Sequence, residues 1–385
     1  MVSTVKKTGL QNYLAAEKKD KEKYIGLESL EEETFEEDQL PYDLINIRIE
    51  QKTITVYQIE HWIRQGRLNL TPEYQRNLVW NDQRKSALIE SLMLKIPIPS
   101  FYLDEGDNGQ KSVIDGMQRL TTIHSFLNDQ FSLKGLQYLS SYENKTFSQL
   151  DIKFQGIIED TIFNINILSQ QCPQMVKFDI FRRVNTGGVP LNFQEIRNIM
   201  AVPKARTLLR EMAGCEEFLY ATGHRINDVR MNAQELCLRY LTILYCYDWE
   251  QKELKNYTGL LRSMDNMILQ LNHLTDEQHA HTLKEFKKVM LQCYEILGKT
   301  SFCKPKSRLI NKSLFTGWAV VLTNMKLADN TLHGISDKIF NKYQDYLKTD
   351  MAFFNAITSS TGTRGHLLLS LEVIRNIMEE FIHVQ

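Results

Sequence analysis

The stretch SVIDGMQRLTTIHSFL, residues 112–127, decides the fold of the first half of this chain. Its opening residues are apolar and β-branched, which predicts a buried strand that ends at Asp115. Gly116 supplies a turn, and the apolar residues after it recur at helical spacing. The stretch therefore predicts a strand, a glycine turn and a helix in direct succession.

Polar residues follow this turn and suggest a phosphate site. The first turn of a helix offers unpaired N–H groups and the positive end of a dipole, which favour an anion. Gln118, Arg119, Thr121 and Thr122 are expected to be the first exposed groups. Asp115 could cap the helix, hold a metal together with a nucleotide, or position water. A plain turn in which Asp115 only caps the helix is the alternative interpretation.

A second segment, TPEYQRNLVWN at residues 71–81, places Gln75 and Arg76 after Pro72. Proline disfavours helix in the residue before it, and Asn81 is the expected N-cap of the next helix. The segment is therefore predicted to be a loop that presents an arginine.

A third segment covers residues 174–198, QMVKFDIFRRVNTGGVPLNFQEIRN. It predicts a helix that buries Val176, Ile180, Phe181 and Val184 and ends at the NTGG turn. Arg183 and Asn185 lie beside this turn and are predicted ligand-binding residues. The polar side chains would then flank an exposed glycine turn.

The next helix has a complete set of start signals. Asn192 is the expected N-cap, Glu195 completes a capping box, and Leu191 and Ile196 are spaced as a hydrophobic staple. A purely architectural role for Asn192 and Glu195 stays open beside a functional one.

The wider pattern predicts an α+β protein in three parts. Residues 1–45 hold six lysines and eleven acidic residues, which is typical of a mobile charged tail. Residues 46–200 alternate short strands and helices, with an Asn108-Gly109 hairpin turn, and residues 201–385 are mostly helical in spacing.

Composition excludes several classes of protein. The net charge is −1, from 46 basic and 47 acidic residues, so no global basic excess indicates nucleic-acid binding. No stretch approaches the roughly 18 uninterrupted apolar residues of a membrane helix, and six scattered cysteines suggest reduced thiols in a cytoplasmic protein. The chain also lacks a P-loop, a GxSxG elbow, a GxGxxG fingerprint and a His/Cys metal signature.

The three segments, in this order, resemble the family with a PxYQR, a DGQQR and an FxRxNxGG motif. This family is represented by the N-terminal part of GmrSD-type, modification-dependent restriction systems. The motifs stand here as PEYQR at residues 72–76, DGMQR at 115–119 and FRRVNTGG at 181–188, and Met117 replaces the usual first glutamine. The resemblance extends through LNFQEIRN (191–198) and RMNAQELCLRY (230–240).

The resemblance implies a ParB/sulfiredoxin-like fold whose DGQQR turn contributes to a nucleotide-phosphate site. No cysteine occupies the turn, so sulfiredoxin-like redox chemistry is not expected. The implied catalytic residues are Asp115, Gln118 and Arg119, with Asp115 also meeting a metal through the nucleotide. The implied nucleotide-binding residues are Gln75, Arg76, Gly116, Thr121, Thr122, Arg183 and Asn185.

The leading hypothesis is a cytoplasmic regulatory protein of restriction or phage defence that binds a nucleoside triphosphate with Mg²⁺ and hydrolyses it slowly. The nucleotide state would control action on DNA. DNA, a nuclease partner protein and a second copy of the chain stay open as partners. Two alternatives remain: a non-catalytic ParB-like module that binds DNA or a partner, and a ParB-like nuclease.

Overall fold

In the computed structural model, the chain forms two compact units, which are described separately. The structure describes residues 47–70, 80–106, 109–184, 192–298, 302–328 and 330–382. The first unit holds the described residues up to 184, and the second holds those from 192 onward. The first mixes strands and helices and the second is mostly helical, so the α+β prediction is confirmed.

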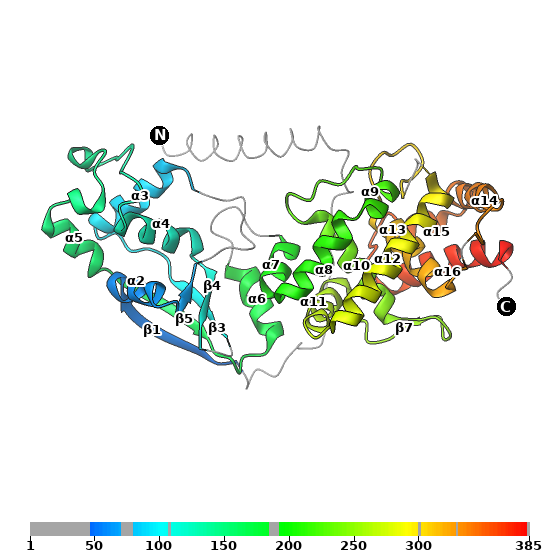
Figure 1. Ribbon diagram of the computed structural model, residues 1–385, viewed down its shortest axis with the longest axis horizontal. Helices are drawn as coiled ribbons and strands as arrows, with labels where there is room; N and C mark the ends of the chain where they lie inside the picture. Colours follow the sequence, from blue (N-terminus) through cyan, green and yellow to red (C-terminus); the bar gives the residue numbers. More distant parts are fainter. Residues whose placement is uncertain are drawn as a thin grey trace. The chain divides into compact units, whose positions relative to one another are not determined.

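A five-stranded sheet in the order β1-β5-β3-β4-β2 organises the first unit (Figure 1). The sheet is mixed: β1 pairs with β5 and β3 with β4 in antiparallel fashion, whereas β3 pairs with β5 and β2 with β4 in parallel. The strands are β1 (Ile49–Thr55), β2 (Leu68–Asn69), β3 (Phe101–Glu105), β4 (Lys111–Asp115) and β5 (Ile162–Leu168). Pairing of β3 with β4 confirms the predicted hairpin; Asn108 itself lies outside the described residues.

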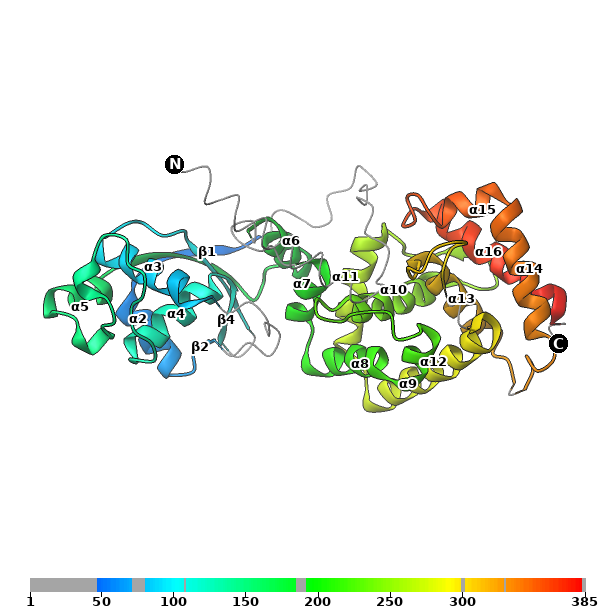
Figure 2. The same ribbon diagram turned by 90° about the horizontal axis from the view of Figure 1, so that it is seen from above.

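Four helices cover one face of this sheet (Figure 2). They are α2 (Val56–Arg64), α3 (Asp82–Met93), α4 (Met117–Leu127) and α5 (Ile152–Glu159). Their apolar faces share one core with the strands, in which the rings of Phe101 and Phe163 lie 4.8 Å apart. The core fixes the carboxyl end of β4 and the start of α4 against the same strand, β3.

Local capping signals in the sequence formed as predicted. Asn81 accepts a hydrogen bond from the Arg84 N–H at 2.9 Å and starts α3. Asn192 and Glu195 form a reciprocal capping box with two bonds of 2.7 Å. Leu191, the first residue of the predicted staple, lies outside the described part of the chain.

The opposite face of the sheet receives α6 (Gln174–Val184). Lys177 of α6 is 3% exposed and its Nζ lies 2.6 Å from the Asp104 carboxylate of β3. Val176 and Phe181 are buried as predicted, whereas Ile180 and Val184 are only partly buried and Lys177 and Phe178 are buried in addition. The Lys177 ammonium is accommodated because a carboxylate meets it there.

Two carboxylates hold the long loop between α4 and α5. Glu90 accepts the N–H groups of Gln137, Tyr138 and Leu139 at 2.7–3.0 Å. Glu143 accepts the two preceding N–H groups of the loop, at 2.7 and 3.2 Å. Five consecutive backbone donors are thus satisfied without regular secondary structure.

The second unit is built around α13 (Lys312–Met325), which packs against α10 (Asn232–Cys246), α12 (Asp276–Leu297) and α16 (Arg364–Phe381). Its Trp318 ring stands edge-on to Tyr343 with centroids 5.1 Å apart. The prediction that residues 201–385 are mostly helical is confirmed. The elements are α7 (Phe193–Met200), α8 (Pro203–Gly214), α9 (Glu216–Ala221), α10 (Asn232–Cys246), β6 (Tyr247–Asp248), β7 (Glu253–Leu254), α11 (Leu260–Leu271), α12 (Asp276–Leu297), α13 (Lys312–Met325), α14 (Ser336–Thr349), α15 (Met351–Ala356) and α16 (Arg364–Phe381).

Candidate functional site

The junction between β4 and α4 carries the predicted site residues. Gly116 is the N-cap of α4 with φ of +98°, and no side chain among the described residues caps the first turn. A Cβ at Gly116 would lie 2.3 Å from the Phe101 ring, so the position requires glycine both for its backbone and for its space. The Asp115 carboxylate accepts a hydrogen bond from the backbone N–H of Gly116, the N-cap residue, whereas Gly116 itself has no side chain to cap the first turn of α4.

Asp115 and Arg119 form an ion pair across the first turn of α4. Their Oδ2 and Nη2 atoms are 2.7 Å apart, and the two side chains are 26% and 12% exposed. Arg119 also donates to the carbonyl oxygens of Pro99 and, at 3.2 Å, Ser100. Its guanidinium lies 4.4 Å from the centre of the Phe101 ring. Arg119 thereby fixes the entry to β3 beside the start of α4.

Burial sets the electrostatics of this pair. Desolvation raises the pKa of Asp115 above the ordinary value of an aspartate and outweighs the attraction of Arg119. Burial likewise lowers the pKa of Arg119, against the opposing effect of Asp115. A carboxylate kept half-buried in this way is a stronger proton acceptor than one in water, which makes Asp115 a functional candidate.

The other predicted residues of α4 differ in their surroundings. Gln118 accepts, at 3.4 Å, from the N–H of Trp80, the residue that follows the undescribed 71–79 segment. Thr121 is exposed. Thr122, however, is 2% exposed and its hydroxyl donates to the Gln118 carbonyl at 2.7 Å. The expected exposure of Thr122 is wrong, because it lies on the face of α4 that packs into the core.

The structure brings together Asp115, Gly116, Gln118 and Arg119 on one turn. Gln75, Arg76 and Asn185 lie outside the described residues. Arg183 is exposed near the end of α6, and no contact between described residues links it to Asp115 or Arg119. Convergence of three arginines on one site stays a prediction.

The described residues hold no cluster of three or more His, Cys, Asp or Glu that could bind a metal ion by itself. Asp115 is the carboxylate at the junction, and it already meets Arg119. This fits Mg²⁺ that arrives with a nucleotide, since such an ion takes most of its ligands from phosphate and water. It does not fit a resident metal centre.

A polar cluster farther along α4 was missed by the sequence analysis. Glu60 of α2 is 7% exposed and its carboxylate contacts His124 Nδ1 at 2.8 Å, Arg64 Nε at 2.8 Å and Asn128 Nδ2 at 3.1 Å. Burial alone would raise the pKa of Glu60, but the bonds from His124, Arg64 and Asn128 together lower it. The spacing of Glu60 and Arg64 was visible in the sequence; their meeting with α4 was not.

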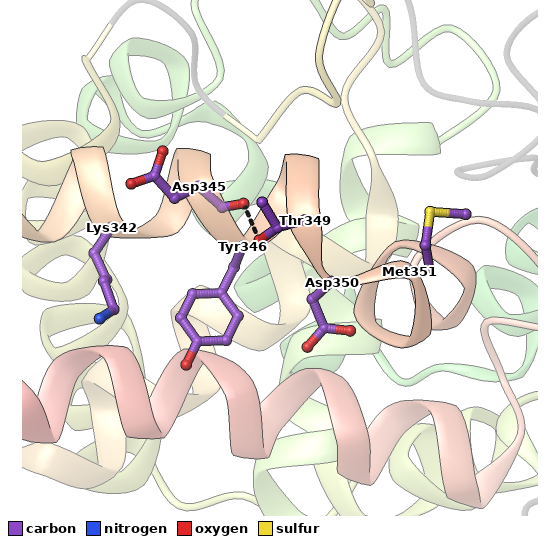
Figure 3. A pocket seen from close by; sticks show the side chains of 6 residues that line it. All are labelled: Lys342, Asp345, Tyr346, Thr349, Asp350 and Met351. Atoms are coloured by element: carbon purple, nitrogen blue, oxygen red, sulfur yellow. Dashed lines mark hydrogen bonds between the residues drawn. The ribbon is translucent and has the colours of Figure 1, made fainter.

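A depression of about 570 Å³ lies on the second unit, at the end of α14 and the start of α15 (Figure 3). Thr349 there donates its hydroxyl to the Asp345 backbone carbonyl at 2.8 Å, and Lys342 pairs with Glu380. Asp350 caps α15 through the Phe353 N–H. None of the predicted site residues lines this depression, which is widely open to solvent.

The fold and the junction together define a class of α+β domain. In this class a strand ends in a half-buried carboxylate, and a left-handed glycine without a side-chain cap begins the next helix. Residues 59–200 match the family model of the GmrSD restriction endonuclease N-terminal domain, so this segment is similar to the GmrSD-type family. The match supports a component of a restriction or phage-defence system. No curated protein matches the chain significantly. None of the described helices is both long and apolar enough to cross a membrane.

Proposed function

We propose that the first unit binds a nucleoside triphosphate with Mg²⁺ at the β4–α4 junction, hydrolyses it slowly, and thereby controls the action of a restriction system on DNA. The observation that carries this proposal is the start of α4: its N-cap is a left-handed glycine, which has no side chain to cap the N–H groups of the first turn. Such a helix start favours a phosphate group.

Each residue of the junction has a role in this proposal. Gly116 would place its backbone at the phosphate end of the helix, with the Phe101 ring filling the space of a Cβ, and Thr121 offers an exposed hydroxyl one turn along α4. Arg119 keeps the first turn of α4 and the entry to β3 in fixed register through its bonds to two carbonyls. Gln118 connects the turn to the segment that carries Gln75 and Arg76, through Trp80.

Asp115 would bind the Mg²⁺ ion of the nucleotide and orient the attacking water molecule. A carboxylate beside a phosphate repels it, and Mg²⁺ brought by the nucleotide would offset that repulsion. Because burial raises its pKa, Asp115 is also suited to accept a proton from a water molecule that it orients. Arg76 and Arg183 would supply positive charge from the flanking segments.

Calorimetric titration of the full chain with ATP, GTP, CTP and UTP, with and without Mg²⁺, tests the proposal. We expect one or more nucleotides to bind and to raise the melting temperature, since the ligand binds the folded form. Asp115→Asn should weaken Mg²⁺-dependent binding by about tenfold or more, which corresponds to about 1.4 kcal/mol. Glu105→Gln is the matched control, because Glu105 is an ion-paired carboxylate at the other end of the same hairpin. Equal binding by both variants would remove Asp115 from the site.

Binding to DNA in the same experiments separates the alternatives. DNA affinity that falls steeply with salt and does not respond to nucleotides would replace the proposal with a DNA-binding module. Cleavage of plasmid DNA by the chain alone, lost in Asp115→Ala, would favour a nuclease. A nuclease partner protein becomes the expected target of regulation if the chain binds nucleotide but does not cleave.

A further inference from the structure

The outer edge of the sheet in the first unit is formed by β1. In the strand order β1-β5-β3-β4-β2, β1 pairs with β5 alone, along all seven of its residues. An edge strand of this length presents a row of backbone groups that can pair with another strand. The opposite edge strand, β2, has two residues and offers no comparable row.

Two hydrogen bonds just beyond the ends of β1 show which of its residues bond to β5. The N–H of Ser169 donates to the Arg48 carbonyl at 3.1 Å, and the N–H of Val56 donates to the Thr161 carbonyl at 3.0 Å. Hydrogen-bonded pairs recur at every second residue of an antiparallel ladder. The even-numbered residues of β1 therefore direct their backbone groups to β5.

The odd-numbered residues Ile49, Gln51 and Thr53 direct their N–H and carbonyl groups outward. All three are exposed, and no described residue bonds to their outward backbone groups. Thr55 ends the row, because its N–H donates to the Gln58 side chain at 3.1 Å. The available edge is thus centred on Gln51.

Two opposite charges flank this centre. Glu50 and Lys52 project to the same side of the sheet as Ile54, with side chains 57% and 39% exposed. Their charged atoms are 3.0 Å apart within the strand. A single charge on an edge strand opposes pairing with another strand. Two opposite charges on either side of a central residue can instead pair with the same two charges of an antiparallel second copy, because each then lies opposite a charge of the other sign.

We propose that β1 pairs with β1 of a second copy of this chain, antiparallel and centred on Gln51. In this register Glu50 lies opposite Lys52 of the second copy, and Lys52 lies opposite its Glu50. Gln51 meets its own equivalent as a hydrogen-bonded pair, which uses the outward groups of both strands. The two five-stranded sheets then join into one continuous sheet.

The charges of Glu50 and Lys52 favour this register over the two registers shifted by one residue. Centring the pair on Lys52 would place the two ammonium groups directly opposite, and centring it on Glu50 would do the same for two carboxylates. Like charges opposite each other destabilise a strand pair. In the register centred on Gln51 the Glu50–Lys52 pairs fall at positions without direct hydrogen bonds, where side chains approach most closely.

Sedimentation of the full chain over a wide concentration range tests the pairing through charge reversal. Native protein should dimerise reversibly. Glu50→Lys and Lys52→Glu should each weaken the dimer by about tenfold or more, because both cross-strand pairs become like-charged. The double variant Glu50→Lys/Lys52→Glu should restore it, and an equimolar mixture of the two single variants should form a mixed dimer.

Thr53→Pro gives a test that is independent of charge. The Thr53 N–H points away from β5, so proline there removes an outward donor without removing a bond within the sheet. We expect a monomer with a nearly unchanged melting temperature. A native chain that stays monomeric at every concentration, or a dimer unaffected by Thr53→Pro and by both single charge reversals, would overturn the proposal. Recovery in the double variant is the outcome that unspecific surface effects would not produce.

Discussion

Two arginine–aspartate pairs, one in each unit, have the same chemistry and different surroundings. In the helical unit, Arg197 Nε lies 2.8 Å from Asp265 Oδ1, and the side chains are 1% and 0% exposed. In the α+β unit, Arg119 and Asp115 are 2.7 Å apart and remain partly exposed. The distances are nearly equal, so distance does not distinguish the two pairs.

The surroundings do distinguish them. Arg197 also donates to the Leu261 carbonyl at 3.2 Å, and its pair links α7 to α11 deep in the helical unit. A ligand could reach the Arg197–Asp265 pair only if the surrounding helices unfolded, because both side chains are buried. The Asp115–Arg119 pair instead borders an uncapped helix start and keeps a carboxylate partly open to solvent. We infer that the first pair serves stability and the second serves the proposed site.

The largest effect is expected from Arg197→Ala. It leaves the Asp265 carboxylate in the interior without its guanidinium, so the free energy of unfolding should fall by about 3–5 kcal/mol. Urea denaturation followed by circular dichroism measures this loss. Arg197→Met with Asp265→Leu should recover most of it, because apolar side chains of similar size need no counter-charge. A loss below about 1 kcal/mol in the single variant would contradict the stability role.

A smaller effect is expected from Gly116→Ala at the junction. The new Cβ would meet the Phe101 ring and adopt an unfavourable positive φ, which should cost about 2–3 kcal/mol. Gly66→Ala is the matched control: its φ is +68° but no atom lies within 4 Å of the added Cβ. The control should lose only about 1 kcal/mol in the same denaturation experiment. Equal losses would mean that the close approach of Phe101 does not constrain the junction.

The smallest change in the free energy of unfolding is expected from Asp115→Asn, and its pH dependence tests the difference between the two ion pairs most directly. Because burial raises the pKa of Asp115, its stabilising contribution is present below about pH 3.9 and is lost as pH rises through the raised pKa. The Asn variant should therefore gain stability relative to native protein as pH rises, by less than about 1 kcal/mol.

Glu90→Gln should show the opposite slope. Burial alone would raise the pKa of Glu90, but three backbone N–H bonds lower it, so its contribution is present at neutral pH and lost in acid. Urea midpoints of both variants from pH 3 to 8 provide the measurement. Parallel slopes for the two variants would contradict the assignment of Asp115 as a carboxylate held at a cost in stability.

Much of the fold could be predicted because its signals are local. Asn81, Gly116 and the Asn192–Glu195 box act within one helical turn, so a single stretch of sequence contains the whole interaction. The helical segments of the second unit were equally visible in their spacing. The position of Thr122 was not, because the rotation of α4 about its axis depends on how it packs.

The contacts that could not be predicted join distant parts of the chain. Lys177 with Asp104, Arg197 with Asp265 and Glu60 with His124 each pair residues far apart in sequence. Nothing near any of these residues indicates its partner. At the site, the Asp115–Arg119 spacing was readable, whereas the bonds of Arg119 to Pro99 and Ser100 depend on where β3 enters the sheet.

The loop held by Glu90 and Glu143 has a consequence for how the first unit opens. Its five amides, from Gly135 to Leu139, are bonded to side chains and not to a ladder of backbone groups. Protonating the Glu90 carboxyl group, whose pKa is lowered by its three backbone bonds, would weaken the bonds to Gln137, Tyr138 and Leu139 together. Acidification should thus lower the protection of this one peptide against deuterium exchange, relative to its intrinsic rate at each pH, well before the surrounding sheet opens.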